Sequence, residues 1–380
     1  MTSLDTGRLQ SSWATIARFG DQVPLFFYST LFLTHPGARD MFPLAMDVQR
    51  DKLVHALGHV VSNVDDLPSV VPVLQQLGRD HRRFAVTRDH YPAVGDALLA
   101  TLEHFLAEEW DDDLAASWGK AYGVVAEVMI AAAADADADS PPWYDATVAS
   151  VERRTASVAV LRVTPAVPIP YVAGQSLALE IPARPRTWRY YSPATLPDED
   201  GSFELHVRAV PGGAVSTALV QSTRVGDRVR FGAPVGDDLT LDRAVRSDIV
   251  LVAGGTGLSP LKALLGQIEA EGAGGRRVIL FWGARRAFEL YDMPAMERLG
   301  RHDWFRLVPC VSDETSTGGF IQHGTAVQVA LRHTDPGAHD VFLCGSPEMV
   351  DGTLAALRAV GTPDELLHAE RWGTDERAGR

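Results

Sequence analysis

Residues 250–260 read VLVAGGTGLSP, an apolar run that passes directly into a loop with three glycines. A helical pattern follows at residues 261–268. Glycines at a strand-to-helix junction let the backbone approach a diphosphate at the helix N-terminus, although a tight structural turn uses the same residues. The spacing is not the G-x-G-x-x-G fingerprint of dinucleotide-binding proteins. The stretch predicts a strand, a loop and a helix that begin an α/β region.

The segments on either side of this loop have different periods. Toward the C-terminus, apolar strands alternate with helical segments, which predicts a parallel α/β sheet. These strands cover residues 249–253, 278–282, 305–311 and 341–344. Toward the N-terminus, short strands with turn residues between them predict a small antiparallel barrel. They cover residues 144–151, 157–163, 176–181, 203–210 and 228–231.

The N-terminal third has a third pattern. Apolar residues recur there at helical spacing, and no strand-like alternation interrupts residues 8–134. The stretch AAAADADADSPP at residues 131–142 predicts the end of a helix and then a linker. We therefore predict a multidomain chain: an all-α domain at residues 1–136, an antiparallel β-barrel domain at 143–245 and an α/β parallel-sheet domain at 246–380.

The composition excludes several classes of protein. A chain of 380 residues is too long for a single core. Its net charge of -14 argues against a nucleic-acid partner, which would need a basic stripe. Two cysteines, Cys310 and Cys344, exclude a disulfide framework, a four-cysteine zinc site and an all-cysteine iron–sulfur cluster. No apolar run approaches ~18 residues, so neither a membrane span nor secretion is expected, and we predict a cytoplasmic location.

Six segments of the N-terminal third carry a resemblance. They are FYxxLFxxxP at residues 27–36, MF at 41–42, QxxxL at 49–53, His81, HYPxVGxxLL at 90–99 and WxxAYG at 118–123. In this order they resemble the globin domain of flavohaemoglobins, over most of residues 10–132.

The resemblance implies haem b as the cofactor of this domain. It implies His81 as the proximal ligand and therefore the metal ligand, since haem iron takes a neutral imidazole. It implies Tyr28 and Gln49 on the opposite face, where a hydrogen-bond donor stabilises bound oxygen. It also implies Phe42 and Leu53 as the apolar wall that contacts the porphyrin.

The orientation of His81 departs from the family pattern in part. The family orients its proximal histidine with a tyrosine, which Tyr91 matches, and with a glutamate, whose position is Ala133 here. A second-shell carboxylate makes the imidazole more electron-donating, and Glu127 lies too early in the helix to replace it. Asp80 stands where a basic residue is usual, which leaves Arg82 or Arg83 as candidate partners of a haem propionate.

The middle of the chain resembles the flavin domain of ferredoxin-reductase-type flavoproteins through Arg189-Tyr190-Tyr191-Ser192, their R-x-Y-S motif. The resemblance implies bound FAD, with Arg189 at the pyrophosphate, Tyr191 packed on the isoalloxazine and Ser192 near flavin N5. It implies further FAD-binding residues at Gly213, Ser216, Glu370 and Trp372. Ser176 stands where the family has a flavin-contacting tyrosine.

The C-terminal third resembles the nucleotide-binding domain of the same reductases. Here the loop of residues 254–260 implies nucleotide contacts at Gly255, Thr256, Gly257 and Pro260, and Cys344-Gly345 resembles the second nucleotide signature near the nicotinamide. Arg285 and Arg286 could offer cations to a 2′-phosphate, but NADH-using relatives have similar segments. The cofactor is therefore NADH or NADPH, with NADH preferred.

The combined resemblance implies nitric oxide dioxygenation, in which electrons pass from NAD(P)H through FAD to haem and nitric oxide and oxygen become nitrate. The expected partners are the small molecules O2 and NO, with no nucleic acid, membrane span or obligate protein partner. Three alternatives stay open: an NAD(P)H-dependent oxidoreductase acting on another small oxidant, an oxygen- or redox-sensing globin, and a reductase for soluble acceptors with a vestigial globin.

Overall fold

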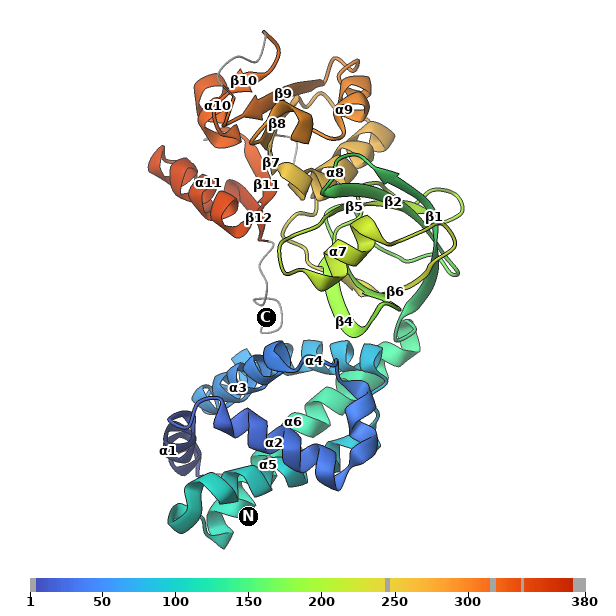
Figure 1. The fold of residues 1–380 in the computed structure, drawn as a ribbon. Helices are drawn as coiled ribbons and strands as arrows, with labels where there is room; N and C mark the ends of the chain where they lie inside the picture. The colour runs from blue at the N-terminus through green and yellow to red at the C-terminus, as the bar shows by residue number, and fades with distance from the viewer. Residues whose placement is uncertain (1–4, 243–246, 315–318, 336–337, 372–380) are drawn as a thin grey trace. The chain divides into compact units, whose positions relative to one another are not determined.

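The computed structural model describes residues 5–242, 247–314, 319–335 and 338–371. The chain divides into two compact units that adjoin at Trp143 and Tyr144 (Figure 1). Each unit is described by itself below. Among the helices of the described ranges, none is long and apolar enough to cross a membrane.

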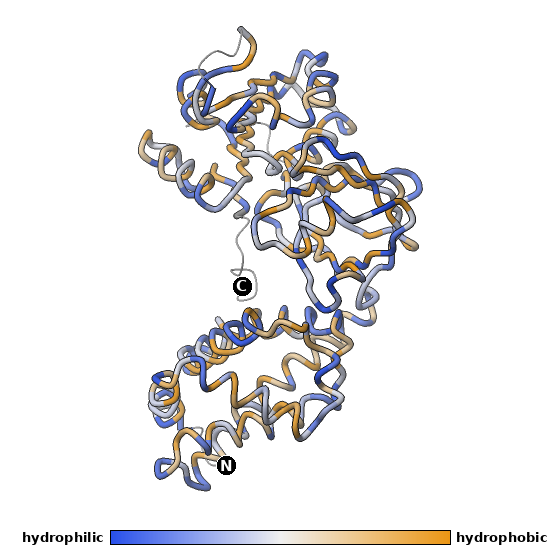
Figure 2. The backbone as a smooth tube through the Cα atoms, in the orientation of Figure 1, coloured by the Kyte–Doolittle hydropathy of each residue, from blue (hydrophilic) through white to orange (hydrophobic). Residues whose placement is uncertain are grey.

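The N-terminal unit is entirely helical. Its main helices are α1 (Thr6–Ala17), α2 (Gln22–Thr34), α3 (Asp47–Ser62), α4 (Leu67–His81), α5 (Tyr91–Leu106) and α6 (Asp112–Asp139). Short 3₁₀ turns connect them: η1 (Pro36–Met41), η2 (Arg82–Phe84), η3 (Arg88–His90) and η4 (Ala107–Glu109). Hydrophobic and hydrophilic stretches alternate along these helices in Figure 2, as expected where one face of each helix packs inward.

Helix α6 is longer than the sequence pattern predicted. It continues past residue 134 to Asp139, because alanine has the highest helix propensity and outweighs the interspersed aspartates. It ends at Ser140, directly before Pro141 and Pro142, where proline disfavours helical geometry in the preceding residue. The linker to the next unit therefore begins at Ser140, near the end of the stretch 131–142 in which the sequence predicted it.

Helices α4 and α6 make the contact that places His81. An added Cβ on Gly78 would lie 2.3 Å from the carbonyl oxygen of Met129, so only glycine allows the two backbones to approach this closely. At the carboxyl end of α4, the buried Arg82 donates to Asp137 at 2.7 Å and to the carbonyl of Ser140. These contacts fix the last turn of α4 against α6.

The first half of the C-terminal unit, here called the antiparallel half, contains a six-stranded sheet of order β4-β3-β6-β1-β2-β5. Its strands are β1 (Tyr144–Arg153), β2 (Val158–Pro165), β3 (Ser176–Ile181), β4 (Arg184–Tyr191), β5 (Phe203–Arg208) and β6 (Arg228–Val235), with helix α7 at Ala214–Gln221. A bridge between Pro193 and Leu205 joins its two edges. Strand β4 was missed from the sequence because RPRTWRYY shows no apolar alternation.

The second half, here called the parallel half, contains a six-stranded parallel sheet of order β10-β9-β8-β7-β11-β12. Its strands are β7 (Ile249–Gly254), β8 (Val278–Ala284), β9 (Phe305–Val311), β10 (Gln322–His323), β11 (Asp340–Gly345) and β12 (Leu367–Arg371). Its helices are α8 (Leu258–Glu271), α9 (Met293–Leu299), α10 (Ala326–His333) and α11 (Pro347–Ala359), with short 3₁₀ turns η5 (Gly255–Gly257), η6 (Ala287–Glu289) and η8 (Asp364–Leu366).

Both faces of this parallel sheet are covered. Leu251 and Ala253 pack into one hydrophobic cluster, and Val250 and Val252 pack into another, as alternation along a strand requires. The predicted fold class, an all-α domain followed by an antiparallel barrel-like sheet and a parallel α/β sheet, is confirmed.

Candidate functional site

A cavity of about 720 Å³ lies inside the N-terminal unit. This volume is typical of a site for an organic cofactor. Its walls come from α2, η1, α3, α4, α5 and α6, and most of them are apolar. The lining includes all the residues that the sequence assigned to haem, namely Tyr28, Phe42, Gln49, Leu53, His81 and Tyr91.

His81, the last residue of α4, has the features of a metal ligand. Its Nδ1 lies 2.7 Å from the carbonyl oxygen of Leu77. A carbonyl can only accept, so Nδ1 carries the proton and Nε2 keeps its lone pair. Burial lowers the pKa of His81, which keeps the ring neutral as haem ligation requires. The apolar cavity and this imidazole therefore fit a haem.

Tyr28 on α2 contributes a hydroxyl to the same cavity. The side chain is buried, and burial raises the pKa of Tyr28 to about 12, so the hydroxyl stays protonated. It donates to the main-chain carbonyl of Gln49 at 3.3 Å. The edge of the Phe42 ring packs on Tyr28 with centroids 5.4 Å apart. The structure thus brings Tyr28, Gln49 and Phe42 together, with the main chain of Gln49 as the bonded partner.

The surroundings of His81 lack a carboxylate at the expected position. Ala133 follows Met129, the last α6 residue that lines the cavity. Glu127 points to solvent and lies 3.5 Å from Arg88 in an exposed ion pair. Tyr122, whose role the sequence did not indicate, donates its hydroxyl to the carbonyl of Tyr91 at 2.7 Å and lines the cavity.

The two arginines expected at a haem propionate lie elsewhere. Arg82 is bound to the end of α6, as described above, and Arg83 lies 3.4 Å from Asp80. Neither lines the cavity, and among the described lining residues there is no arginine or lysine. No motif of the sequence indicated that Arg82 would be buried.

In the C-terminal unit, three predicted or noted flavin residues meet in a buried triangle. Glu370 on β12 accepts from Ser176 on β3 at 2.9 Å and from Ser192, which follows β4, at 3.1 Å. The two hydroxyls lie 2.8 Å apart, and all three side chains are buried. Ser176, which stands where the family has a tyrosine, therefore has a role of its own. It completes a hydrogen-bonded link between the two halves of the unit.

The rest of the predicted flavin residues lie nearby in the antiparallel half. Burial raises the pKa of Tyr191 next to Ser192. Gly213 begins α7, and a Cβ there would lie 2.5 Å from the hydroxyl of Ser216. Arg189 lies on β4. Trp372 lies outside the described residues. These groups offer a cation, an aromatic ring and the N-terminal turn of a helix, which fit FAD.

The two nucleotide signatures also come together. Gly255 adopts φ +54°, and a Cβ on Gly257 would lie 2.1 Å from the carbonyl of Cys344, so the loop packs directly on the end of β11. Gly345 follows there, while Thr256 and Pro260 lie in the loop and the first turn of α8. This junction of two glycine-containing turns at the carboxyl ends of parallel strands fits a dinucleotide.

Arg208 was missed by the sequence argument. Its guanidinium lies 2.9 Å from where a Cβ on Gly255 would stand, and it also donates to Glu289 at 3.1 Å. Glu289 accepts from the backbone N–H groups of Arg285 and Arg286 at 3.1 Å each. A carboxylate therefore lies beside the two arginines, and the choice between NADH and NADPH stays a prediction.

Comparisons with known proteins agree with this arrangement. Three family models match successive parts of the chain: globin at residues 25–129, oxidoreductase FAD-binding domain at 145–238 and oxidoreductase NAD-binding domain at 251–354. A "Flavohemoprotein" of Bacillus subtilis (strain 168) is 26% identical, covering 96% of both chains. The xylene/toluene monooxygenase electron transfer component XylA of Pseudomonas putida is 33% identical over 61% of this chain and 66% of its own.

Two solved structures share the fold. The flavohemoglobin of Malassezia yamatoensis, with bound FAD and heme, has a TM-score of 0.75 at 19% identity and covers 98% of this chain and 99% of that one. The FAD/NAD-binding domain of a nitric oxide dioxygenase from Vibrio cholerae has a TM-score of 0.54 at 22% identity, covering 61% of this chain and 99% of that domain.

Fold, sites and family matches define a haem-binding globin fused to a reductase that binds FAD and NAD. The protein is an NAD(P)H-dependent oxidoreductase with haem, FAD and NAD(P)H as cofactors. Over nearly its whole length the chain is similar to flavohaemoglobins, whose order of globin, FAD-binding and NAD-binding domains it shares. The roles of single residues in these sites, and the domain boundaries at 136 and 245, stay predictions.

Proposed function

We propose that this protein is a nitric oxide dioxygenase. In this reaction nitric oxide, oxygen and one electron give nitrate, and the electrons pass from NAD(P)H through FAD to haem. One observation carries the proposal: His81 and the protonated hydroxyl of Tyr28 line one apolar cavity in a chain that also holds a complete reductase. The substrates are O2 and NO, both small enough for such a cavity.

The cavity residues have distinct tasks. Haem, when bound, supplies a redox-active iron that takes one protein ligand and one gas molecule. His81 offers the neutral Nε2, and its bond to Leu77 holds the ring in one orientation. Tyr28 must turn its single hydroxyl proton from the Gln49 carbonyl toward a ligand, and the 3.3 Å length of that bond makes the exchange easy.

The reductase residues hold and orient. FAD, when bound, accepts a hydride and releases electrons one at a time. Glu370 with its two serine hydroxyls forms a fixed polar wall where the two halves of the unit meet. The loop at Gly255 and Gly257 leaves backbone N–H groups at the start of α8 for a diphosphate.

A second function is favoured by one observation. The Nδ1 of His81 bonds to a neutral carbonyl, and Ala133 provides no carboxylate. A less electron-donating imidazole disfavours oxygen chemistry that needs a strong donor, which supports electron delivery to another small oxidant instead.

Nitric oxide consumption at an electrode tests the choice, with the haem- and FAD-loaded protein, NADH and air. The proposal expects rapid catalytic consumption with nitrate as product, lost in the His81→Ala variant. Negligible consumption while NADH still reduces the haem would reject it in favour of another oxidant. A cytoplasmic location and independence from a protein partner stay predictions.

A further inference from the structure

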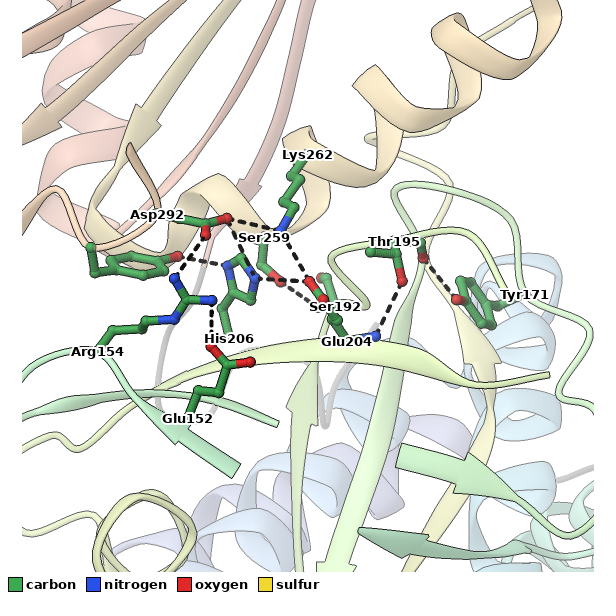
Figure 3. Close-up of polar contacts among 11 residues, drawn as sticks. Glu152, Arg154, Tyr171, Ser192, Thr195, Glu204, His206, Ser259, Lys262 and Asp292 are labelled. Carbon is green, nitrogen blue, oxygen red and sulfur yellow. Dashed lines mark hydrogen bonds and ion pairs between the residues drawn. The ribbon is translucent and has the colours of Figure 1, made fainter. Parts of the chain in front are cut away.

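One face of α8 lies on the antiparallel half at two points, shown in Figure 3. Ser259 donates its hydroxyl to the main-chain carbonyl of Ser192 at 2.7 Å. Lys262, three residues later and so on the same helix face, donates to Glu204 on β5 at 3.0 Å. The helix that begins at the nucleotide loop is therefore joined to the flavin motif itself and to the neighbouring strand.

Lys262 is the centre of a charged cluster, formed by Glu204, Lys262, Asp292 and Arg154 and here called the Lys262 cluster. Its Nζ also lies 2.8 Å from Asp292, which is 2% exposed. Arg154 lies 3.7 Å from the other oxygen of Asp292. Arg154 also pairs with the more exposed Glu152 at 2.7 Å. Each buried carboxylate of the cluster thus has a cation partner, as buried charges require.

His206, which lies beside this cluster, is uncharged. His206 follows Glu204 on the same face of β5, and its Nδ1 lies 2.8 Å from the hydroxyl of Tyr291. Burial lowers the pKa of His206, so the ring is neutral. Its Nε2 lies 3.7 Å from Glu204 and 4.0 Å from Asp292, beyond hydrogen-bond distance. Lys262 is thus the cation that both carboxylates contact within hydrogen-bond distance.

The residue type supports a specific task. Of the 35 basic residues only three, Lys52, Lys120 and Lys262, are lysines. An ammonium is a compact point charge with three donors and suits two carboxylates that approach from different elements, whereas a guanidinium presents a flat fork. The cluster therefore has the chemistry of a short, rigid connection between β5, α8 and the segment before α9.

We propose that Lys262 is a positioning residue for hydride transfer between NAD(P)H and FAD. It fixes the first turns of α8, and with them Gly255 and Gly257, relative to Ser192 of the flavin motif. Hydride transfer depends steeply on the distance between donor and acceptor, and a displacement of about 1 Å can slow a reaction by about a hundredfold. Lys262 itself need not touch either cofactor. The inference rests on the reductase chemistry and is independent of the oxidant used at the haem.

The test is anaerobic stopped-flow reduction of FAD by NADH in the full-length, haem- and FAD-loaded protein. In Lys262→Met, which keeps the length of the side chain, we expect the limiting rate of flavin reduction to fall about tenfold or more. The apparent Kd for NADH should change less than about threefold, because the loop that binds the nucleotide is retained. The long-wavelength charge-transfer absorbance between flavin and nicotinamide should weaken in parallel.

Two further variants keep the test decisive. Glu204→Gln keeps the shape of the cluster and the Lys262–Asp292 pair, so it should fold even where Lys262→Met does not, with a smaller loss of limiting rate. Lys262→Arg restores the charge and should recover part of the rate and of the charge-transfer band. The matched control is Arg277→Met, which removes an exposed ion pair with Asp248 in the same half and should leave both signals unchanged.

Three outcomes would overturn the proposal. One is a folded, FAD-saturated Lys262→Met protein with the limiting rate and charge-transfer band of the parent. Another is weaker NADH binding with an unchanged limiting rate, which would make Lys262 a binding residue. The third applies if Lys262→Met does not fold: Glu204→Gln and Arg277→Met with identical kinetics would show a purely structural role. None of these readouts uses nitric oxide, so failure here is distinct from failure of the proposed function.

Discussion

The globin unit and the reductase unit place their charged side chains differently. Among the described residues that line the globin cavity, the one aspartate or glutamate is Asp89, which is exposed at the rim, and there is no lysine or arginine. The reductase unit instead has the Lys262 cluster between its two halves. The described lining of the globin cavity is therefore mostly apolar, as suits a porphyrin, while the two halves of the reductase contact each other through charged side chains of their own.

The difference has an energetic consequence. The apolar side chains that line the cavity of about 720 Å³ are stabilised by the cofactor that they contact, at about 25 cal/mol per Å² of apolar surface covered, so the globin unit should be less stable without haem. The contact between the reductase halves is instead made by side chains of the protein itself, such as those of the Lys262 cluster.

Removal of haem should have the largest effect, because the globin helices should depend on their cofactor more than the strands of the reductase unit do. We expect amides of α3 and α4 to lose hydrogen-exchange protection in the haem-free protein, because these helices surround the cavity and α4 holds His81. Amides of β7 and β8 should stay protected. Mass-spectrometric hydrogen exchange on both forms measures this. Equal protection of α3 and α4 in the two forms would show that the cavity persists without its cofactor and that the comparison is wrong.

Replacing a glycine at a close backbone contact in each unit should lower the stability of that unit or its affinity for its ligand. Gly78→Ala places a Cβ 2.3 Å from the Met129 carbonyl and should destabilise the globin unit by ~1–3 kcal/mol, with a shifted Soret band because α4 carries His81. Gly257→Ala should weaken NADH binding in the reductase unit. The control is Gly119→Ala in α6, which meets no atom within 4 Å and should be neutral or stabilising by up to about 1 kcal/mol. Denaturant unfolding and the Soret absorbance measure the effect of Gly78→Ala, and titration with NADH measures that of Gly257→Ala.

The two units also differed in how much of them the sequence could predict. The residues that the sequence assigned to haem all line the cavity, because a motif on a helix keeps its residues on one face and the helices had clear periodicity. Tyr122 lines it too, without having been assigned a role. Strands such as β7 and β9 were found because continuous apolar runs mark a parallel sheet. Strand β4 and the short β10 and β12 were not, because their stability comes from neighbouring strands rather than from a pattern of their own.

Long-range polar contacts could not be predicted. Ser176 reads as a missing tyrosine, and its bond to Glu370 joins residues 194 positions apart. Glu204, Lys262 and Asp292 belong to no motif, and only the fold brings β5 beside α8. Arg82 illustrates the converse, since a motif position suggested a haem contact while tertiary structure directs the side chain to Asp137. Side-chain pairing across elements has no local signature.

Removal of one hydroxyl should have a smaller effect inside the globin cavity, where polar groups are few. In Tyr28→Phe, a neutral hydrogen bond worth about 0.5–1.5 kcal/mol is lost to a bound ligand, so oxygen should dissociate about two- to tenfold faster. Rapid-mixing displacement of oxygen by carbon monoxide measures the rate. Tyr122→Phe is the control, because its hydroxyl donates to the Tyr91 carbonyl instead. An unchanged dissociation rate in Tyr28→Phe would mean that the hydroxyl stays on the Gln49 carbonyl.

The smallest expected effect concerns pH and the reductase contact. Burial lowers the pKa of His206 below its usual value near 6.5, so the unfolded chain takes up a proton before the folded one. Stability contributed by neutral His206 is therefore complete above about pH 6.5 and declines below it, by at most about 1.4 kcal/mol per pH unit for one group. Glu204 acts in a lower window. Contact with His206 and the charge of Lys262 lower its pKa to about 2, so its contribution is lost only as pH falls below about 4.5.

Urea unfolding, followed by the release of flavin, measures the contribution of His206 to stability at each pH. Between pH 7.5 and 5.5 the parent protein should lose stability, and His206→Gln, which keeps a polar partner for Tyr291, should lose less. At pH 7.5 and above, the free energies of unfolding of the two proteins should differ only by a constant amount. Identical slopes from pH 7.5 to 5.5 would mean that His206 stays accessible to protons in the folded state. Water would then reach the contact between the two halves as it reaches an ordinary surface. That result would contradict the burial of His206 and Asp292 in the folded protein.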